Sequence, residues 1–318
     1  LTTTLYFTNS CGQKSDDENT NLTTDISNKT FSNKGTNCLA YLGEYSAKSK
    51  DIGQDKDFIS SVSIKQNSSH CTFSSNSIPN HNFNDGQSTF VNKTSEVIES
   101  FNINVNPQKS NSTTSLSLSY DNGIFLNGVK IDMLAAACYG IGNEPLGKEK
   151  TGCNEDKPWR YDPMFSLNNF GTDSHNAHTQ PDGAYHYHGD PKAMYDTSGT
   201  VASTVIGFAA DGFPIFGPYI DDQGTIRKVK SGYTLKKGDR SKQSGEGGFP
   251  GNTYDGTYRD DYEFTNSGDL DQCNGMTYNQ VYGYYVTDTF PWIIACFTGT
   301  PDKSFKKTAS SKPSPKKT

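Results

Sequence analysis

Residues 183–191 read GAYHYHGDP, so two tyrosines alternate with two histidines between a glycine and a Gly-Asp-Pro turn. Successive side chains of a β-strand point to opposite faces of its sheet. This stretch therefore predicts a strand with Tyr185 and Tyr187 on one face and His186 and His188 on the other. We expect the tyrosines to face the core and the histidines to face a functional site.

A period of two recurs in other parts of the chain and determines the predicted fold class. Residues 114–131, TSLSLSYDNGIFLNGVKI, alternate in this way and contain two Asn-Gly pairs typical of hairpin turns. Only 32% of the 318 residues are hydrophobic, yet there are 18 Tyr and 18 Phe, which favour strands. We predict a mainly β protein of loop-rich antiparallel sheets, sandwich-like or an irregular barrel, stabilised by disulfides. Helices should be few and short, and residues 133–140, MLAAACYG, are the best candidate.

Shifts in composition divide the chain into three predicted parts. Residues 1–57 begin with a strand-like stretch, LTTTLYFT, and continue as a polar, turn-rich segment. Residues 58–300 carry most of the short strands and should form the β domain. Residues 301–318 form a basic tail, whose last sixteen residues hold six Lys and no acid.

The charge balance bears on the partners that this protein could have. The total charge is −6, so the chain without these last sixteen residues carries a net charge of −12. An acidic body of this kind gives no case for a nucleic-acid partner. No stretch approaches the ~20 apolar residues that a membrane-spanning helix needs, so we predict no membrane span.

The chain has seven cysteines, with no CxxC pair and no zinc-finger spacing. That usage predicts disulfides, with one cysteine left over. The predicted pairs are Cys138 with Cys153, Cys273 with Cys296, and Cys11 with Cys38. The first two each close a short loop, which stabilises a fold by roughly 3 kcal/mol in the chain-entropy model. Cys71 then remains unpaired or bridges to another subunit.

Disulfides are typical of secreted proteins, and the glycosylation motifs point the same way. Asn-X-Ser/Thr acceptors cluster in the first third of the chain, at Asn21, Asn28, Asn67, Asn92 and Asn111. The sequence begins at Leu1 without a methionine, which favours a mature chain whose signal has been removed. We therefore expect a secreted, extracellular or cell-surface protein that carries N-glycans.

Histidines gather around the opening stretch and are the best candidates for a metal site. Four of the six histidines fall within fourteen residues, at His175, His178, His186 and His188. Asp182 supplies a carboxylate between them. Imidazole suits copper, zinc, nickel and iron, and sets of two to four histidines with a carboxylate are ordinary for such ions. The pattern predicts a divalent transition-metal site, with copper or zinc as the ion.

Two other interpretations of these histidines remain open. They could form a cross-strand ladder in which the rings hydrogen-bond to carboxylates and backbone groups, with no ion at all. Alternatively, His186 or His188 could serve as a catalytic acid or base. No nucleophile motif or pair of carboxylates accompanies them, so we favour a protein that is not an enzyme.

A weak internal repeat relates two parts of the chain. Residues 175–188, HNAHTQPDGAYHYH, resemble residues 273–287, CNGMTYNQVYGYYVT, with one gap. In this alignment His175 matches Cys273 and His178 matches Met276. The repeat predicts two similar hairpins that pack together, of which only one keeps ligand chemistry.

Several motifs together resemble the YHYH-domain family. GAYHYHGDP is followed by VIGFAADGFPIFGPY at 205–219, and the pairing of these two motifs is specific. SNSIPNHNF at 75–83 is similar to the opening of the family, and LDQCNGM at 270–276 with YGYYVTDTFPWIIACFTGT at 282–300 is similar to its close. The resemblance covers roughly residues 58–300.

The resemblance implies a secreted or surface protein that is largely β and has a metal-binding histidine cluster, but it implies no particular activity. Carried over by position, it adds His81 to the four clustered histidines as a candidate ligand. Met276 stands where the family has a histidine, which makes a second site unexpected.

From the two ends of the chain we predict self-association. The strand-like residues 1–8 could add to a sheet edge of another copy, and the basic tail could contact an acidic body. Contacts of this head-to-tail kind build a fibre unless they close into a ring. Our leading hypothesis is a structural subunit of an extracellular fibril or homopolymer. The alternative is a monomeric metal-binding protein or metal-dependent enzyme whose two ends dock on its own domain.

Overall fold

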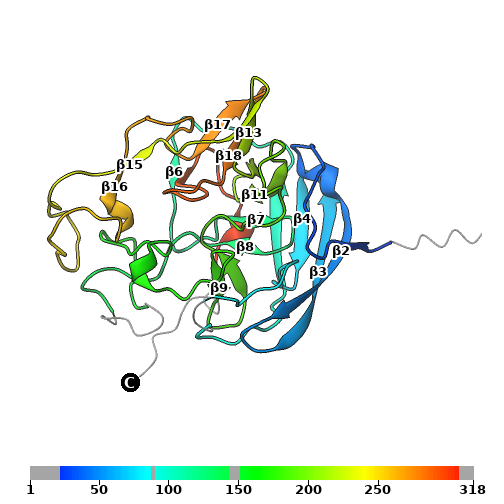
Figure 1. Ribbon diagram of the computed structural model, residues 1–318, viewed down its shortest axis with the longest axis horizontal. Helices are drawn as coiled ribbons and strands as arrows, with labels where there is room; N and C mark the ends of the chain where they lie inside the picture. Colours follow the sequence, from blue (N-terminus) through cyan, green and yellow to red (C-terminus); the bar gives the residue numbers. More distant parts are fainter. Residues whose placement is uncertain (1–21, 87–89, 143–150, 308–318) are drawn as a thin grey trace, which may run out of the picture.

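The computed structural model describes residues 22–86, 90–142 and 151–307. Two sheets dominate this part of the chain, with the first drawn in blue and cyan and the second in green to red (Figure 1). Its helices are short 3-10 turns, at η1 (Cys38–Tyr41), η2 (Ser166–Asn168), η3 (Arg259–Asp261) and η4 (Lys303–Phe305). The predicted mainly β, loop-rich fold is confirmed. The strand expected at residues 1–8, together with Cys11, Asn21 and the tail beyond residue 307, lies outside the described residues.

The first sheet has five strands in the order β1-β2-β3-β4-β5. They are β1 (Thr24–Asp25), β2 (Gly43–Asp51), β3 (Lys56–Asn67), β4 (His70–Ser75) and β5 (Glu99–Asn104). Strands β2 to β5 pair antiparallel with their neighbours in the chain, and β1 pairs parallel to β2. Burial alternates along β3 and β4, as a sheet with one face on the core requires.

The second sheet has eight strands in the order β17-β18-β12-β11-β7-β8-β10-β9. They are β7 (Gly123–Phe125), β8 (Lys130–Ile131), β9 (Ala177–Thr179), β10 (Tyr185–Tyr187), β11 (Val205–Ala209), β12 (Pro214–Phe216), β17 (Gly275–Tyr278) and β18 (Val281–Tyr285). Three smaller two-stranded sheets complete the fold, and they pair β6 (Thr114–Ser115) with β19 (Cys296–Phe297), β13 (Tyr219–Asp222) with β14 (Thr225–Lys228), and β15 (Tyr233–Leu235) with β16 (Tyr262–Phe264).

The eight-stranded sheet consists of two halves with the same pairing. In one half, β10 pairs parallel with β8 of the β7–β8 hairpin, and β9 pairs with β10 at the edge of the sheet. In the other half, the β11–β12 hairpin takes β18 parallel to β12, and β17 forms the edge. The halves meet where β7 pairs antiparallel with β11. The two hairpins that the internal repeat predicts thus occupy equivalent positions, but they lie at opposite ends of the sheet and do not pack together.

The core lies between the two sheets, which stack face to face. The ring centroid of Phe208 on β11 lies 6.1 Å from that of Phe73 on β4 and 5.9 Å from that of Tyr41. The turn at Gly128 touches the first sheet closely. Its φ of +80° favours glycine, and a Cβ there would lie 2.5 Å from Cγ2 of Val62. This contact explains why an Asn-Gly turn is needed at the position.

The predicted boundary between residues 57 and 58 falls inside β3. Residues 24–25 and 43–51 form β1 and β2 of the first sheet. The described part of the N-terminal segment therefore belongs to the same sheet as the start of the β domain. Among the described residues, no helix is both long and apolar enough to cross a membrane.

Three disulfides are present among the described residues. Cys138–Cys153 and Cys273–Cys296 form as predicted. The predicted pairing of Cys38 with Cys11 is wrong, because Cys38 bonds to Cys71. Both of these cysteines are buried in the main core, where the bond ties η1 to β4.

The helix predicted at residues 133–140 is also wrong. Backbone hydrogen bonds in this segment run to distant partners, with the N–H of Tyr139 donating to the carbonyl of Trp159 and the N–H of Tyr161 donating to that of Ala137. These bonds, together with the disulfide at Cys138, hold the segment extended. Long-range pairing thus outweighs the helix propensity of three consecutive alanines.

Candidate metal centre

The β9–β10 hairpin brings three histidines to one face. Its antiparallel register places His178 directly opposite His186. His188 follows two residues later, and its N–H donates to the carbonyl of Asn176 beyond the start of β9. Since residues two apart on a strand share a face, all three imidazoles project to the same side. The tyrosines of β10 point the other way, into the core, as predicted, and the ring of Tyr187 lies 5.1 Å from that of Phe125.

The turn of this hairpin depends on Asp182 and Gly183. Asp182 Oδ1 accepts the N–H of Ala184, and Gly183 has a φ of +93°. Asp182 is exposed, and it is not among the side chains that converge with the histidines. Asp182, a predicted metal ligand, therefore stabilises the hairpin turn and does not lie beside the three histidines.

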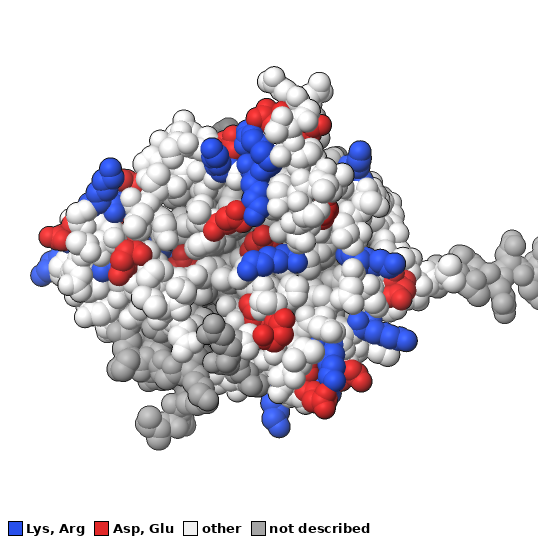
Figure 2. All heavy atoms as spheres, viewed as in Figure 1, with Lys and Arg blue, Asp and Glu red and all other residues white. Residues whose placement is uncertain are grey.

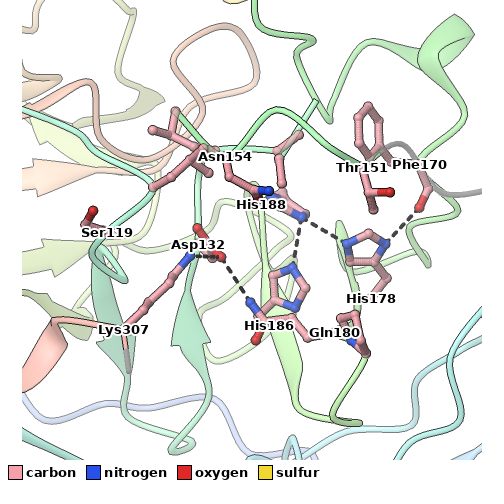
Figure 3. Close-up of a pocket in the computed structure, with 15 residues that line it drawn as sticks. Ser119, Asp132, Thr151, Asn154, Phe170, His178, Gln180, His186, His188 and Lys307 are labelled. Carbon is pink, nitrogen blue, oxygen red and sulfur yellow. Dashed lines mark hydrogen bonds and ion pairs between the residues drawn. The ribbon is translucent and has the colours of Figure 1, made fainter. Parts of the chain in front are cut away.

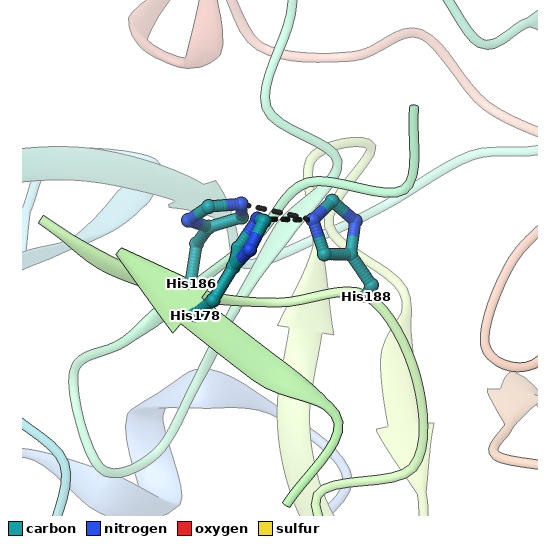
Figure 4. Close-up of side chains that lie close together, drawn as sticks. All are labelled: His178, His186 and His188. Atoms are coloured by element: carbon teal, nitrogen blue, oxygen red, sulfur yellow. Dashed lines mark hydrogen bonds between the residues drawn. The ribbon is translucent and has the colours of Figure 1, made fainter. Parts of the chain in front are cut away.

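The imidazoles of His178, His186 and His188 converge through their Nε2 atoms (Figure 4). The Nε2 atom of His188 lies 3.0 Å from that of His186 and 3.1 Å from that of His178. The three side chains are 3–8% exposed. Among the described residues, they form the group of histidine, cysteine and carboxylate side chains with ligand atoms close enough to hold a metal ion.

The protonation of the site suits a cation. The Nδ1 atom of His178 donates a hydrogen bond to the carbonyl of Phe170 at 2.8 Å, which leaves the lone pair of this residue on Nε2. Burial and then the neighbouring His188 lower the pKa of His186 well below its usual value. Burial and then His178 do the same to the pKa of His188. The rings of His186 and His188 are therefore neutral at pH 7, which is the state that binds metal.

The spacing of the nitrogens fits a transition metal. Zinc binds histidine nitrogen at 2.0–2.1 Å, so two such ligands of a tetrahedral ion lie ~3.3 Å apart. The separations of 3.0 and 3.1 Å are close to that value. The Nδ1 atom of His186 is buried with no hydrogen-bond partner among the described residues, so no second contact orients this ring as the Phe170 carbonyl orients that of His178.

A small cavity and a group of buried charges adjoin the histidines (Figure 3). The cavity has a volume of about 70 Å³. Its polar wall includes Asp132, Gln180 and Lys307, and Nζ of Lys307 lies 2.5 Å from Oδ2 of Asp132. Asp132 follows β8, whose Ile131 pairs with Tyr187, so it shares the face of His186 and His188.

Sequence reasoning did not identify Asp132 or Lys307. The alternation of Lys130, Ile131 and Asp132 was a signal for the first, because it places both charged residues on one face of a strand. Nothing in the sequence indicated that Lys307 would fold back. Lys307 lies in the predicted basic tail, yet its side chain is only 6% exposed.

The other two predicted ligands, His81 and His175, form a separate pair on the tyrosine side of the hairpin. Their rings stack with centroids 3.7 Å apart. His81 Nε2 lies 2.6 Å from the hydroxyl of Tyr187, and its Nδ1 lies 2.8 Å from the carbonyl of Asn82. Burial and then His175 lower the pKa of His81 to about 3, so it stays neutral. His175 Nδ1 bonds to the carbonyl of Pro191. The nitrogens of both rings are thus held by other groups of the chain, and neither residue belongs to the three-histidine group.

The fold and the site geometry together define a class of protein, which is mostly β and has a buried three-histidine site. The family model of the YHYH protein matches residues 100–299, and the chain belongs to this family. Searches of curated proteins and of solved structures found no match.

Proposed function

We propose that this protein binds a divalent transition metal, copper or zinc, through Nε2 of His178, His186 and His188. The observation that carries the proposal is the convergence of three buried imidazoles on one point. Nitrogen ligands favour copper(II) at equal availability, and zinc is the common alternative for histidine sets. The bond from His178 to the carbonyl of Phe170 orients one ligand in advance.

The test is the metal content of the full chain after exposure to Cu²⁺ or Zn²⁺ and removal of free ion. We expect one ion per chain. His188→Gln should weaken binding by more than about 100-fold, because a ligand is lost rather than an outer partner. His175→Gln is the matched control, since it lies in the same hairpin outside the triad and can still donate to Pro191. Equal metal content in the two variants would contradict the proposal.

We also propose that the protein is secreted and N-glycosylated. Three disulfides among the described residues support an oxidising compartment. Of the five acceptors, Asn28, Asn67 and Asn111 are exposed, whereas Asn92 is half-buried and its side chain donates to the carbonyl of Thr179. We expect glycans at the three exposed sites, and mass spectrometry of protein from its native source checks them. Unmodified asparagine at all three would contradict this part.

A second candidate function is that of a self-associating structural subunit. Its support is the charge difference between the acidic body and the basic tail. Acidic and basic side chains are interspersed on the face that Figure 2 shows, so a tail would find acidic groups there. The start of the tail docks on its own body, because Phe305 stacks on Phe101 with centroids 4.6 Å apart. Electron microscopy of native material decides between fibres and monodisperse monomers, and monomers would overturn this candidate.

A further inference from the structure

We propose that the three-histidine site keeps one ligand position open to the adjoining cavity, and that this position takes a small monovalent anion attracted by Lys307. The inference rests on the proposed function and identifies the class of ligand that shares the site. Three observations carry it, namely the number of protein ligands, the size of the cavity and the balance of buried charges.

The described residues supply three ligands and leave room for another. A first-row divalent ion takes four ligands or more, and three protein ligands with one open position is the usual pattern of an accessible site. None of the described carboxylates joins the histidine group, Asp132 included. The remaining position therefore faces the cavity that the three histidines line.

The cavity limits what can enter. A volume of about 70 Å³ leaves room for a small molecule or ion beside the histidines. Leu118, Leu134 and Phe170 make part of its wall apolar, and the Lys307 ammonium group lies on the polar side. These dimensions fit a linear or planar inorganic anion.

The charges beside the histidines favour a negative ligand in the cavity once a divalent ion is bound. Among the described residues, Lys307 and Asp132 line the cavity, and they belong to one group of ion pairs with Lys130, Glu99 and Asp121. Their sum is −1, and a divalent ion raises it to +1. A single monovalent anion brings the group to neutrality, and a buried group of charges is least costly when it is neutral.

The experiment titrates azide into the full chain loaded with Cu²⁺ and follows the azide-to-copper charge-transfer absorption. We expect saturable binding of one azide per copper. Lys307→Met should weaken azide binding by about tenfold, and Asp132→Asn should strengthen it by a similar factor, because each variant changes one nearby charge. Lys306→Met is the matched control, since Lys306 is the neighbouring lysine and is exposed. It should leave the azide affinity unchanged.

The outcomes separate the two proposals. If no copper binds, both the proposed function and this inference are overturned. If one copper binds but azide produces no new absorption, the metal site stands and the open position does not, because another group of the chain fills it. If azide binds with equal affinity to wild type, Lys307→Met and Lys306→Met, the role of Lys307 is overturned. The wild-type titration remains decisive even if the Lys307 variant does not fold.

Discussion

The β9–β10 and β17–β18 hairpins lie at opposite ends of the eight-stranded sheet, and matching contacts build them. In each, one carboxylate oxygen of an aspartate accepts two backbone N–H groups at the start of the first strand. The other oxygen of the same carboxylate accepts a hydrogen bond from a tyrosine hydroxyl on the second strand. The residues are Asp173 with Tyr185 in the first hairpin and Asp271 with Tyr282 in the second. The backbone of both hairpins is therefore fixed by a contact that needs no histidine.

The two hairpins differ at the three positions that face away from the core. Strand registers show that Met276 and Gly283 stand where His178 and His186 do, and Tyr285 corresponds to His188. Phe216 fills the space of the missing imidazole, since a Cβ on Gly283 would lie 2.5 Å from its ring. It also stacks on Tyr285 with centroids 5.0 Å apart. One hairpin thus opens onto a polar cavity, whereas the other closes with aromatic packing.

At neutral pH, the largest expected effect comes from removing the covalent link that only the second hairpin has. Cys273 matches His175 in the repeat and bonds to Cys296, 23 residues away. Replacing both cysteines by alanine should lower the free energy of unfolding by about 3.5 kcal/mol, from the entropy of a loop of this length. Urea unfolding measures it. A chelator should not change this loss, because the bond lies in the half without ligands.

The chelator is the control that sharpens the comparison. Applied to the metal-loaded wild type, it should lower the free energy of unfolding by roughly 2.7 kcal/mol if the free metal stands at 100 times its dissociation constant. The variant that lacks Cys273 and Cys296 should show the same chelator-induced loss, in addition to the loss caused by the missing disulfide. If the two losses do not add, the hairpins are energetically coupled and cannot be treated as independent halves.

The next effect concerns the positions of His186 and Gly283. Gly283→Ala should lower the free energy of unfolding by about 1–3 kcal/mol through overpacking, because its Cβ would meet Phe216 and lie 2.8 Å from the carbonyl oxygen of Pro214. His186 lines a cavity instead, so His186→Ala removes a ring without overpacking. This variant should abolish metal binding, and in metal-free protein it should lose less stability than Gly283→Ala. A larger loss for His186→Ala under chelation would contradict this difference between the hairpins.

The sequence was sufficient to predict both hairpins and their alignment. Alternation in YHYH determines which side chains share a face, and the repeat placed His178 against Met276 because their neighbours match. Local patterns of this kind are decided by strand geometry, which depends on adjacent residues. The short loops that they close indicated two of the disulfides, whose cysteines lie 15 and 23 residues apart.

Contacts over longer distances could not be predicted from the sequence. His81 could join the three histidines only if its segment packed on the histidine face of the β9–β10 hairpin. The segment packs on the tyrosine face instead, where His81 contacts Tyr187. Lys307 lies 175 residues from Asp132 in sequence, so no local pattern relates them. Cys38 bonds to Cys71 because η1 packs against β4, which is a result of folding the whole sheet.

The last expected effect is a difference in pH dependence between two buried tyrosines that stand at equivalent positions. The Tyr187 hydroxyl bonds to Nε2 of His81, whose pKa is lowered to about 3 by burial and then by His175. The Tyr284 hydroxyl bonds to Oδ2 of Asp211, whose pKa is raised by burial. Unfolding thus lets the histidine take up a proton at moderately acidic pH, whereas it makes the aspartate lose one.

The two groups should therefore affect stability with opposite signs. His81 has a lower pKa in the folded state, so its contribution is lost as pH falls from about 6.5 to about 3, at about 1.4 kcal/mol for each pH unit. Asp211 has a higher pKa in the folded state, so its contribution is lost as pH rises above 3.8. Urea unfolding of wild type, His81→Gln and Asp211→Asn between pH 3 and 7 measures both. The stability advantage of wild type over His81→Gln should grow with pH, and its advantage over Asp211→Asn should shrink. Parallel curves for the two variants would show that the hairpins do not differ in this respect.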